Sequence, residues 1–149
     1  MILLSIIVVI TFCSMEFVAW FSHKYIMHGF LWTLHRDHHV KIPGQNWIEK
    51  NDSFFVIFAT PAIICFAVGM YNAPLALAIG IGITLYGLVY FFVHDLFIHQ
   101  RIKVLRNTKN KYLLAIRRAH KVHHKHLQKE DGECFGMLVV PTRFFKNTK

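Results

Sequence analysis

The sequence predicts an all-α integral-membrane protein, a bundle of about three to four transmembrane helices with a histidine-rich cap on its cytoplasmic side. Two observations lead to this fold class. Hydrophobic residues make up 54% of the 149-residue chain and collect in three long runs, which is typical of membrane proteins and not of soluble cores. All 17 Lys and Arg lie outside these runs, in two other stretches. The length suits a single domain over residues 1–149.

The three apolar runs are the predicted spans. Residues 2–21 lack a positively charged start and a small-x-small cleavage site, so we interpret them as a retained span and not as a signal peptide. Residues 54–71 are short for a span of about 20 residues and contain Pro61, where a kink is expected. Residues 74–93 are the third span, and their small residues permit close contact with neighbouring helices. These small residues are Ala76, Ala78, Gly80, Gly82 and Gly87.

Polar sequence separates and follows the spans. Residues 22–53 are polar, and a turn is predicted at Pro43-Gly44. Residues 94–149 are strongly basic, and within them residues 104–126 are expected to form a helix that lies at the membrane interface. Residues 136–140 are apolar but far too short to span, so they are expected to re-enter the membrane or to pack against the bundle.

The basic charge determines the predicted topology. The net charge is +9 and the pI is about 9.7. Such chains often bind nucleic acid, but here the positive residues flank apolar spans, a pattern that suits anionic lipid headgroups instead. We therefore expect no nucleic-acid partner. With three spans, the two basic stretches share one side, which the positive-inside rule makes the cytoplasmic side of a bacterial inner membrane.

Ten of the eleven histidines fall into four tight groups. The groups are His23 and His28; His35, His38 and His39; His94 and His99; and His120, His123 and His124. Such repeated spacing is not the signature of a merely His-rich tract. The eleventh, His126, is interpreted as an amphipathic anchor at the membrane interface and not as a ligand.

The spacing within the groups has geometric content. Positions i, i+3 and i+4 share one face of a helix, so the two groups of three each present three imidazoles together. The two pairs are spaced i, i+5, which is roughly 140° apart on an α-helix with 3.6 residues per turn. These pairs therefore require a helix end, a π-bulge, or two metals approached from different directions.

The ten grouped histidines predict a metal centre. They are too many for one zinc ion with about four ligands and suit two metals of higher coordination number. The sequence has no Glu-x-x-His pattern of the carboxylate di-iron class. Imidazole suits iron, zinc, copper or nickel, so ligand chemistry alone leaves the metal open. Because metal-bound imidazoles usually donate their other N–H to a carboxylate or carbonyl, Glu16, Asp37 and Asp95 are candidates for orienting them.

Other metal chemistries are less well supported. Transport sites normally lie near the bilayer midplane on broken helices, whereas the predicted spans hold no histidine at their centres. The cysteines, Cys13, Cys65 and Cys134, form no CxxC motif, so neither a disulfide framework nor a cysteine-type zinc site is expected. A membrane metal transporter or storage protein thus remains a weaker alternative.

The flanking residues add a family resemblance that covers almost the whole chain. The sequence resembles the bacterial β-carotene hydroxylases of the fatty acid hydroxylase superfamily, whose four histidine boxes have these spacings. The Met27-His28-Gly29 and His99-Gln100-Arg101 contexts point to the carotenoid branch. The matching segments are residues 16–20, 23–29, 35–39, 94–95, 99–101, 120–124 and 132–136.

The resemblance implies a non-haem di-iron enzyme. Such an enzyme uses O₂ and two electrons, usually from a reduced ferredoxin, to hydroxylate C3 of a β-ionone ring. It converts β-carotene through β-cryptoxanthin to zeaxanthin, and its metal ligands correspond to the ten grouped histidines. Zinc is expected to occupy the site in some recombinant preparations, because it binds imidazole at least as well as ferrous iron. A fatty acid or sterol hydroxylase or desaturase is the alternative, since the same centre serves all of them.

Overall fold

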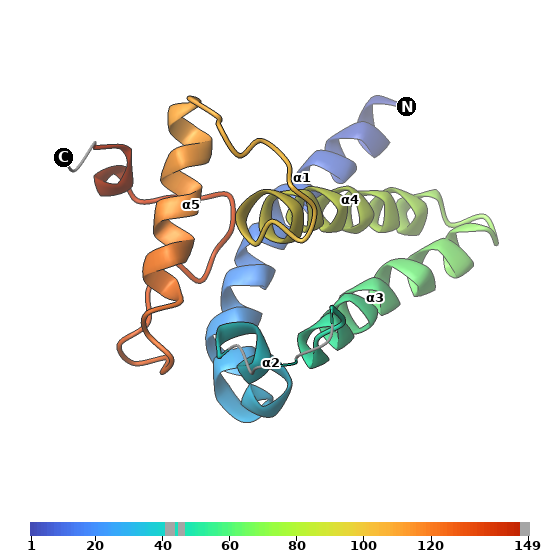
Figure 1. The fold of residues 1–149 in the computed structure, drawn as a ribbon. Coiled ribbons are helices and arrows are strands. Elements are labelled where there is room, and N and C mark those ends of the chain that lie inside the picture. The colour runs from blue at the N-terminus through green and yellow to red at the C-terminus, as the bar shows by residue number, and fades with distance from the viewer. Residues whose placement is uncertain (41–43, 45–46, 147–149) are drawn as a thin grey trace.

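The computed structural model describes residues 1–40, 44 and 47–146, and every regular element in that part of the chain is helical (Figure 1). The predicted turn at Pro43-Gly44 lies partly outside the described residues, since only Gly44 is among them. The elements are α1 (Ile2–Phe21), η1 (Ser22–Phe30), α2 (Trp32–His39), η2 (Lys50–Asp52), α3 (Ser53–Gly69), α4 (Pro74–Phe91), η3 (Phe92–Ile98), α5 (Lys111–His123) and η4 (Thr142–Phe145).

The first span runs on beyond the predicted apolar run. Helix α1 has the predicted bounds and continues directly into η1, so that one helix of 29 residues covers Ile2–Phe30. At 1.5 Å per residue this is about 43 Å, longer than the roughly 30 Å hydrocarbon core of a bilayer. The helix breaks at Gly29, which has φ −108° and ψ −125°. The end that carries His23 and His28 therefore reaches the edge of the apolar layer.

The second and third spans form an antiparallel pair. Helix α3 begins one residue before the predicted run, passes through Pro61 as one helix and ends at Gly69. The chain then reverses through a turn in which Asn72 has a positive φ of 64°. Helix α4 starts with Pro74 in its first turn, where the missing N–H has no helical partner to lose.

Helix α4 lies between α1 and α3 and packs against both. Two of its predicted small residues make the contacts possible. A Cβ on Gly82 would lie 2.6 Å from the Cβ of Thr11 in α1, and one on Gly80 would lie 3.1 Å from the Cβ of Cys65 in α3. A Cβ on Gly87 would meet no heavy atom within 4 Å. The prediction of close helix contact is confirmed at the first two glycines, while Gly87 faces open space.

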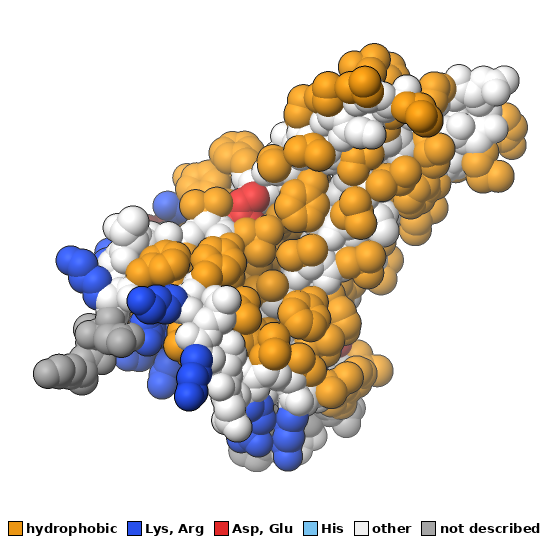
Figure 2. All heavy atoms as spheres, turned by 90° about the horizontal axis from the view of Figure 1, so that it is seen from above, with side chains coloured by type: hydrophobic (Ala, Val, Ile, Leu, Met, Phe, Trp, Pro, Cys, Tyr) orange, Lys and Arg blue, Asp and Glu red, His pale blue; other side chains and the backbone are white. Residues whose placement is uncertain are grey.

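The described residues contain three helices long and apolar enough to cross a membrane, which are Ile2–Phe30, Lys50–Gly69 and Pro74–Ile98. Hydrophobic side chains cover most of the face seen in Figure 2, and Lys and Arg gather at one end of it. This confirms the predicted all-α membrane bundle. A fourth span, which the sequence left open, is not found among these helices.

The basic C-terminal half differs from the predicted interfacial helix over 104–126. Helix α5 covers only Lys111–His123, because the Asn110 side chain accepts hydrogen bonds from the N–H groups of Tyr112 and Leu113 and so caps its start. One face of α5 is buried in the protein and carries Ala119, His120 and His123. The predicted helix is therefore too long by about two turns at its N-terminal end.

The segment that follows α5 returns along the bundle without regular structure as far as η4. Of the two alternatives for residues 136–140, packing is the one observed. Met137 is buried in a small hydrophobic cluster with Val93 of η3 and Ile116 of α5. Carbonyls of this return segment contact His23 and His123, which matters for the centre described next.

Candidate metal centre

Nine of the ten predicted ligands lie in two groups, in each of which the ligand atoms are all within 4.8 Å of one another. Helices α2 and α5 contribute to both groups, while η1 contributes to the first and η3 to the second. The first group is His23, His28, His35, His39 and His123, and the second is His38, His94, His99 and His120.

The tenth predicted ligand, His124, lies between the groups. Its Nε2 is 2.8 Å from the Nε2 of His120, and its ring stacks on that of His39 with the centroids 4.2 Å apart. His126 belongs to neither group. The structure thus brings all ten predicted histidines together and leaves the predicted bystander outside, while their binding of metal stays a prediction.

The two i, i+5 pairs are brought together by π-helical turns. Segments η1 and η3 are both π-helical. Each ends with a backbone hydrogen bond between residues five apart, from Leu31 N–H to Ile26 O at 3.0 Å and from His99 N–H to His94 O at 2.9 Å. Wider turns bring residues five apart toward the same face. The ring centroids of His94 and His99 are consequently only 4.6 Å apart. Two of the three predicted solutions therefore occur together: each pair lies on π-helical turns and at a helix end, with His28 before the break at Gly29 and His99 at the end of η3.

Four imidazoles of the first group have their Nδ1 proton fixed by an oxygen that can only accept a hydrogen bond. Three of these acceptors are backbone carbonyls and one is a side-chain amide oxygen. The pairs are His23 with Phe135 O at 2.9 Å, His28 with Leu127 O at 2.9 Å, His123 with Glu133 O at 3.0 Å, and His35 with Asn51 Oδ1 at 2.6 Å.

The second nitrogens of these neutral rings therefore carry bare lone pairs that face one another. The Nε2 atoms of His23 and His35 are 3.0 Å apart, and those of His28 and His123 are 3.2 Å apart. Two lone pairs cannot hydrogen-bond each other, whereas a metal ion between them would stabilise this arrangement. Two nitrogens bound at right angles, each about 2.1 Å from one metal, would be about 3 Å apart. The donor set and its spacing fit a metal ion.

In the second group, carboxylates fix the Nδ1 protons of two imidazoles. His38 Nδ1 is 2.9 Å from Glu49 Oε2, and His94 Nδ1 is 3.0 Å from Asp95 Oδ2. The Nε2 atoms of His38 and His94 are buried without a hydrogen-bond partner among the described residues. Buried polar atoms rarely lack a partner, so these two nitrogens are further candidates for metal ligation.

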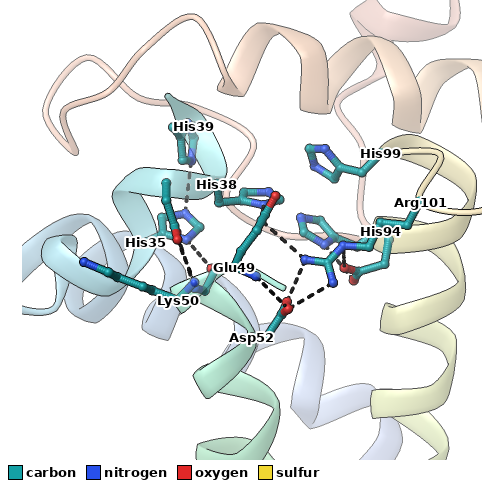
Figure 3. Close-up of polar contacts among 12 residues, drawn as sticks. His35, His38, His39, Glu49, Lys50, Asp52, His94, His99 and Arg101 are labelled. Atoms are coloured by element: carbon teal, nitrogen blue, oxygen red, sulfur yellow. Dashed lines mark hydrogen bonds and ion pairs between the residues drawn. The ribbon is translucent and has the colours of Figure 1, made fainter. Parts of the chain in front are cut away.

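Arg101 holds both of these carboxylates in place (Figure 3). Its Nε lies 3.1 Å from Asp95 Oδ1, and its Nη2 lies 3.3 Å from Glu49 Oε2. The same guanidinium forms a bidentate ion pair with Asp52, in which Nη2 donates to Oδ1 at 2.6 Å and Nη1 donates to Oδ2 at 3.1 Å. The Arg101 side chain is 11% exposed. This network joins the loop before α3 to η3, and it gives the second group an anionic support that the observed acceptors of the first group do not provide.

Several of the buried histidines outside the spans have a lowered pKa. Burial, with nearby imidazoles adding to it, lowers the pKa of His38, His120 and His123. Burial likewise lowers the pKa of His35 to about 3, against the opposing hydrogen bond to Asn51. A neutral imidazole is the form that binds metal, so these rings are ready as ligands at neutral pH.

The three carboxylates that were predicted to orient imidazoles differ in the groups that they contact. Asp95 does hydrogen-bond an imidazole, that of His94. Asp37 accepts from the backbone N–H of Lys50 and Asn51, and so supports His35 indirectly through Asn51. The expectation that Glu16 contacts an imidazole is wrong, because its carboxylate is taken by backbone N–H groups and a tyrosine from distant parts of the chain.

Glu49, Asn51 and Arg101 are the supporting residues that the sequence reasoning missed. Glu49 and Asn51 lie outside every histidine box, and only folding of the polar loop brings them beside α2. A capping-box pattern was visible, since Asp52 follows Glu49 by three residues and accepts from its backbone N–H. That pattern marks a helix start, however, and does not indicate a metal site.

An apolar cavity of about 400 Å³ opens next to the second group. Residues of α1, α3 and α4 line it. The lining runs from Ile63 and Leu88, which are exposed on the outside of the bundle, to Phe54 and His94, which are buried. Gly87 lies on its wall. The cavity is within the range of about 300–1,000 Å³ of ligand sites, and it joins the lipid-facing surface to the histidines.

Comparison with known proteins agrees with this site. The sequence model of the fatty acid hydroxylase family matches residues 8–146. A beta-carotene hydroxylase of Pseudescherichia vulneris is 40% identical over 91% of this chain and 76% of its own length. One from Paracoccus sp. (strain PC1) is 38% identical over 91% of this chain and 83% of its own length. The chloroplastic beta-carotene 3-hydroxylase 1 of Arabidopsis thaliana is 35% identical over 86% of this chain and 41% of its own length.

No solved structure matches the chain. The family match nevertheless extends over both histidine groups, most of the first span, the other two spans and the return segment. The chain belongs to the fatty acid hydroxylase family, and within it is similar to the beta-carotene hydroxylases of bacteria.

Proposed function

We propose that this protein is a β-carotene 3-hydroxylase that uses O₂ at a non-haem di-iron centre. It hydroxylates C3 of the β-ionone ring and converts β-carotene through β-cryptoxanthin to zeaxanthin. The observation that carries the proposal is the apolar cavity that joins the lipid-facing surface to His94. The similarity to bacterial beta-carotene hydroxylases supports the choice of substrate over a fatty acid or sterol.

The centre has the donors for this chemistry. Ten imidazoles in and between two groups would hold two iron ions, which supply the oxidant for an unactivated C–H bond when bound. In the net reaction one oxygen atom of O₂ enters the C–H bond as a hydroxyl. The other leaves as water, with two electrons and two protons from outside.

The protein's own residues position the substrate and exclude water. The cavity is walled by aromatic and aliphatic side chains such as Phe54, Phe58 and Met27, which favour an apolar ring. A ring that enters from the side, past Ile63 and Leu88, would end against His94 while the polyene extends back toward the lipid. Holding the reacting carbon next to the centre is the main contribution of such a site.

The electron donor would approach from the aqueous side. Exposed basic residues lie at this end of the molecule, namely Lys103, Arg106, Lys109, Lys111, Lys121 and Lys125. They suit an acidic partner such as a reduced ferredoxin. We place this side in the cytoplasm, and the spans in the bacterial inner membrane, by the positive-inside rule.

The test is expression in β-carotene-producing bacteria with chromatography of the pigments. We expect β-cryptoxanthin and zeaxanthin to appear, and variants His35→Ala and His94→Ala to leave β-carotene unchanged. Unchanged β-carotene with the unaltered protein present in the membrane would refute the carotenoid substrate. Parallel analysis of fatty acids and sterols would then identify the alternative.

A further inference from the structure

Glu16 is an acidic residue within a membrane-spanning helix, and all of its observed partners lie far away in the chain. Its Oε1 accepts three hydrogen bonds from consecutive backbone N–H groups, those of Met137, Leu138 and Val139, at 2.8, 2.8 and 3.0 Å. Its Oε2 accepts from the hydroxyl of Tyr86 in α4 at 2.6 Å. A carboxylate at such depth is costly, and these four bonds compensate for its lost hydration.

The same return segment supplies acceptors to the first histidine group. We call residues 133–140 the strap. The carbonyl of Phe135 accepts from His23 Nδ1 at 2.9 Å, and that of Glu133 accepts from His123 Nδ1 at 3.0 Å. Phe135 is 3% exposed, and its ring packs edge-on against both imidazoles. The strap therefore sets the tautomers of two predicted ligands, His23 and His123, which lie near opposite ends of the sequence.

Gly136 is the single residue between the anchored and the accepting parts of the strap. A Cβ on it would lie 2.7 Å from Glu16 Oε1. Glu16 thus sits directly against the strap backbone, one residue away from the carbonyl that holds His23. Because only Gly136 separates the two contacts, a shift of the strap at Glu16 would also move that carbonyl.

We infer that Glu16 is a positioning residue for the first histidine group: with Tyr86, it fastens the strap so that the strap carbonyls aim His23 and His123 at their metal. The inference rests on the proposed two-metal centre. It assigns Glu16 no contact with substrate, metal or imidazole. Residues that hydrogen-bond metal ligands typically contribute 10–100-fold to metal affinity. Displacing the strap should therefore lower the affinity for one of the two metal ions by about that factor.

The strap has other attachments, so loss of Glu16 need not detach it. Met137 packs with Val93 and Ile116, and the Tyr112 hydroxyl donates to Leu138 O at 2.5 Å. These contacts keep the strap packed on the bundle. The hydrogen bonds to Glu16, in contrast, set the position of the strap carbonyls relative to the histidines. The inference therefore predicts a selective loss of metal affinity with the fold retained.

The experiment is anaerobic titration of the full-length, metal-free protein in detergent with Fe²⁺ against a competing chelator. The unaltered chain should bind two equivalents. Glu16→Gln should weaken one binding step by about 10–100-fold, and Tyr86→Phe should weaken the same step less. Tyr71→Phe is the matched control, since Tyr71 is 86% exposed, and it should bind as the unaltered chain does.

A second variant identifies the step. Glu49→Gln acts on His38 of the second group, so it should weaken the other step, and the double variant Glu16→Gln, Glu49→Gln should weaken both. Thermal unfolding of each metal-free variant gives the stability separately. Two unweakened steps in Glu16→Gln, or equal weakening of both steps, would overturn the role of Glu16. If Glu16→Gln does not fold, unchanged binding by Tyr86→Phe overturns it. Failure of the unaltered chain to bind two equivalents would overturn the two-metal centre itself.

Discussion

Replacing Arg101 by methionine should destabilise the metal-free protein strongly. The guanidinium faces three carboxylates, and the Asp95 and Glu49 side chains are 0% and 6% exposed. Removing one partner of a buried ion pair leaves an unpaired charge and typically costs about 3–5 kcal/mol. Methionine keeps much of the apolar stem, so the loss reports mainly on the charge. Arg101→Lys should cost less, because lysine retains the charge but cannot form the two-pronged contact with Asp52.

The measurement is the free energy of unfolding in detergent, with metal removed so that binding does not contribute. Lys129→Met is the control: its ion pair with Glu130 is exposed, and its loss should cost no more than about 1 kcal/mol. In a background of Asp95→Asn, the cost of Arg101→Met should fall by about 1 kcal/mol or more, since one unpaired charge is gone. A loss below about 1 kcal/mol for Arg101→Met alone would refute the reasoning.

Further predictions concern the cavity, the helix contact, pH and the metal. Gly87→Leu should fill open space in the cavity and reduce hydroxylation, measured by pigment chromatography, without lowering metal content; Leu85→Phe, outside the cavity lining, is its control. Gly82→Ala should lower the unfolding free energy by about 1–3 kcal/mol, because its Cβ would collide with Thr11. The pKa of His35 is lowered from 6.5 to about 3 in the folded chain. As the pH falls, the unfolded chain therefore binds this proton at a higher pH than the folded chain does. Unfolding of the metal-free protein should therefore show full stability above about pH 6.5 and a progressive loss as the pH falls toward 3. Protein loaded only with zinc should bind but not hydroxylate carotene, and full turnover by iron-free protein would contradict the redox role of iron.

The sequence alone determined the helical architecture and the histidine set. Spans are set by local composition, since apolar runs of sufficient length must enter lipid as helices. The i, i+3, i+4 spacing placed imidazoles on one face because helix geometry is the same in every protein. The i, i+5 pairs left a helix end, a π-bulge or two metals open, and the structure contains π-helical turns at helix ends.

The tertiary structure decided how these histidines divide and what supports them. His38 and His39 are neighbours in the chain and share one short helix, yet they belong to different groups. Glu16 lies two turns before His23, which suggested direct contact, but it hydrogen-bonds backbone more than a hundred residues away. Spacing along a helix gives the direction of a side chain, while its partner depends on which distant segment packs there. For that reason the grouped histidines were visible in the sequence, and their supports, from Glu49 and Arg101 to the strap carbonyls, were not.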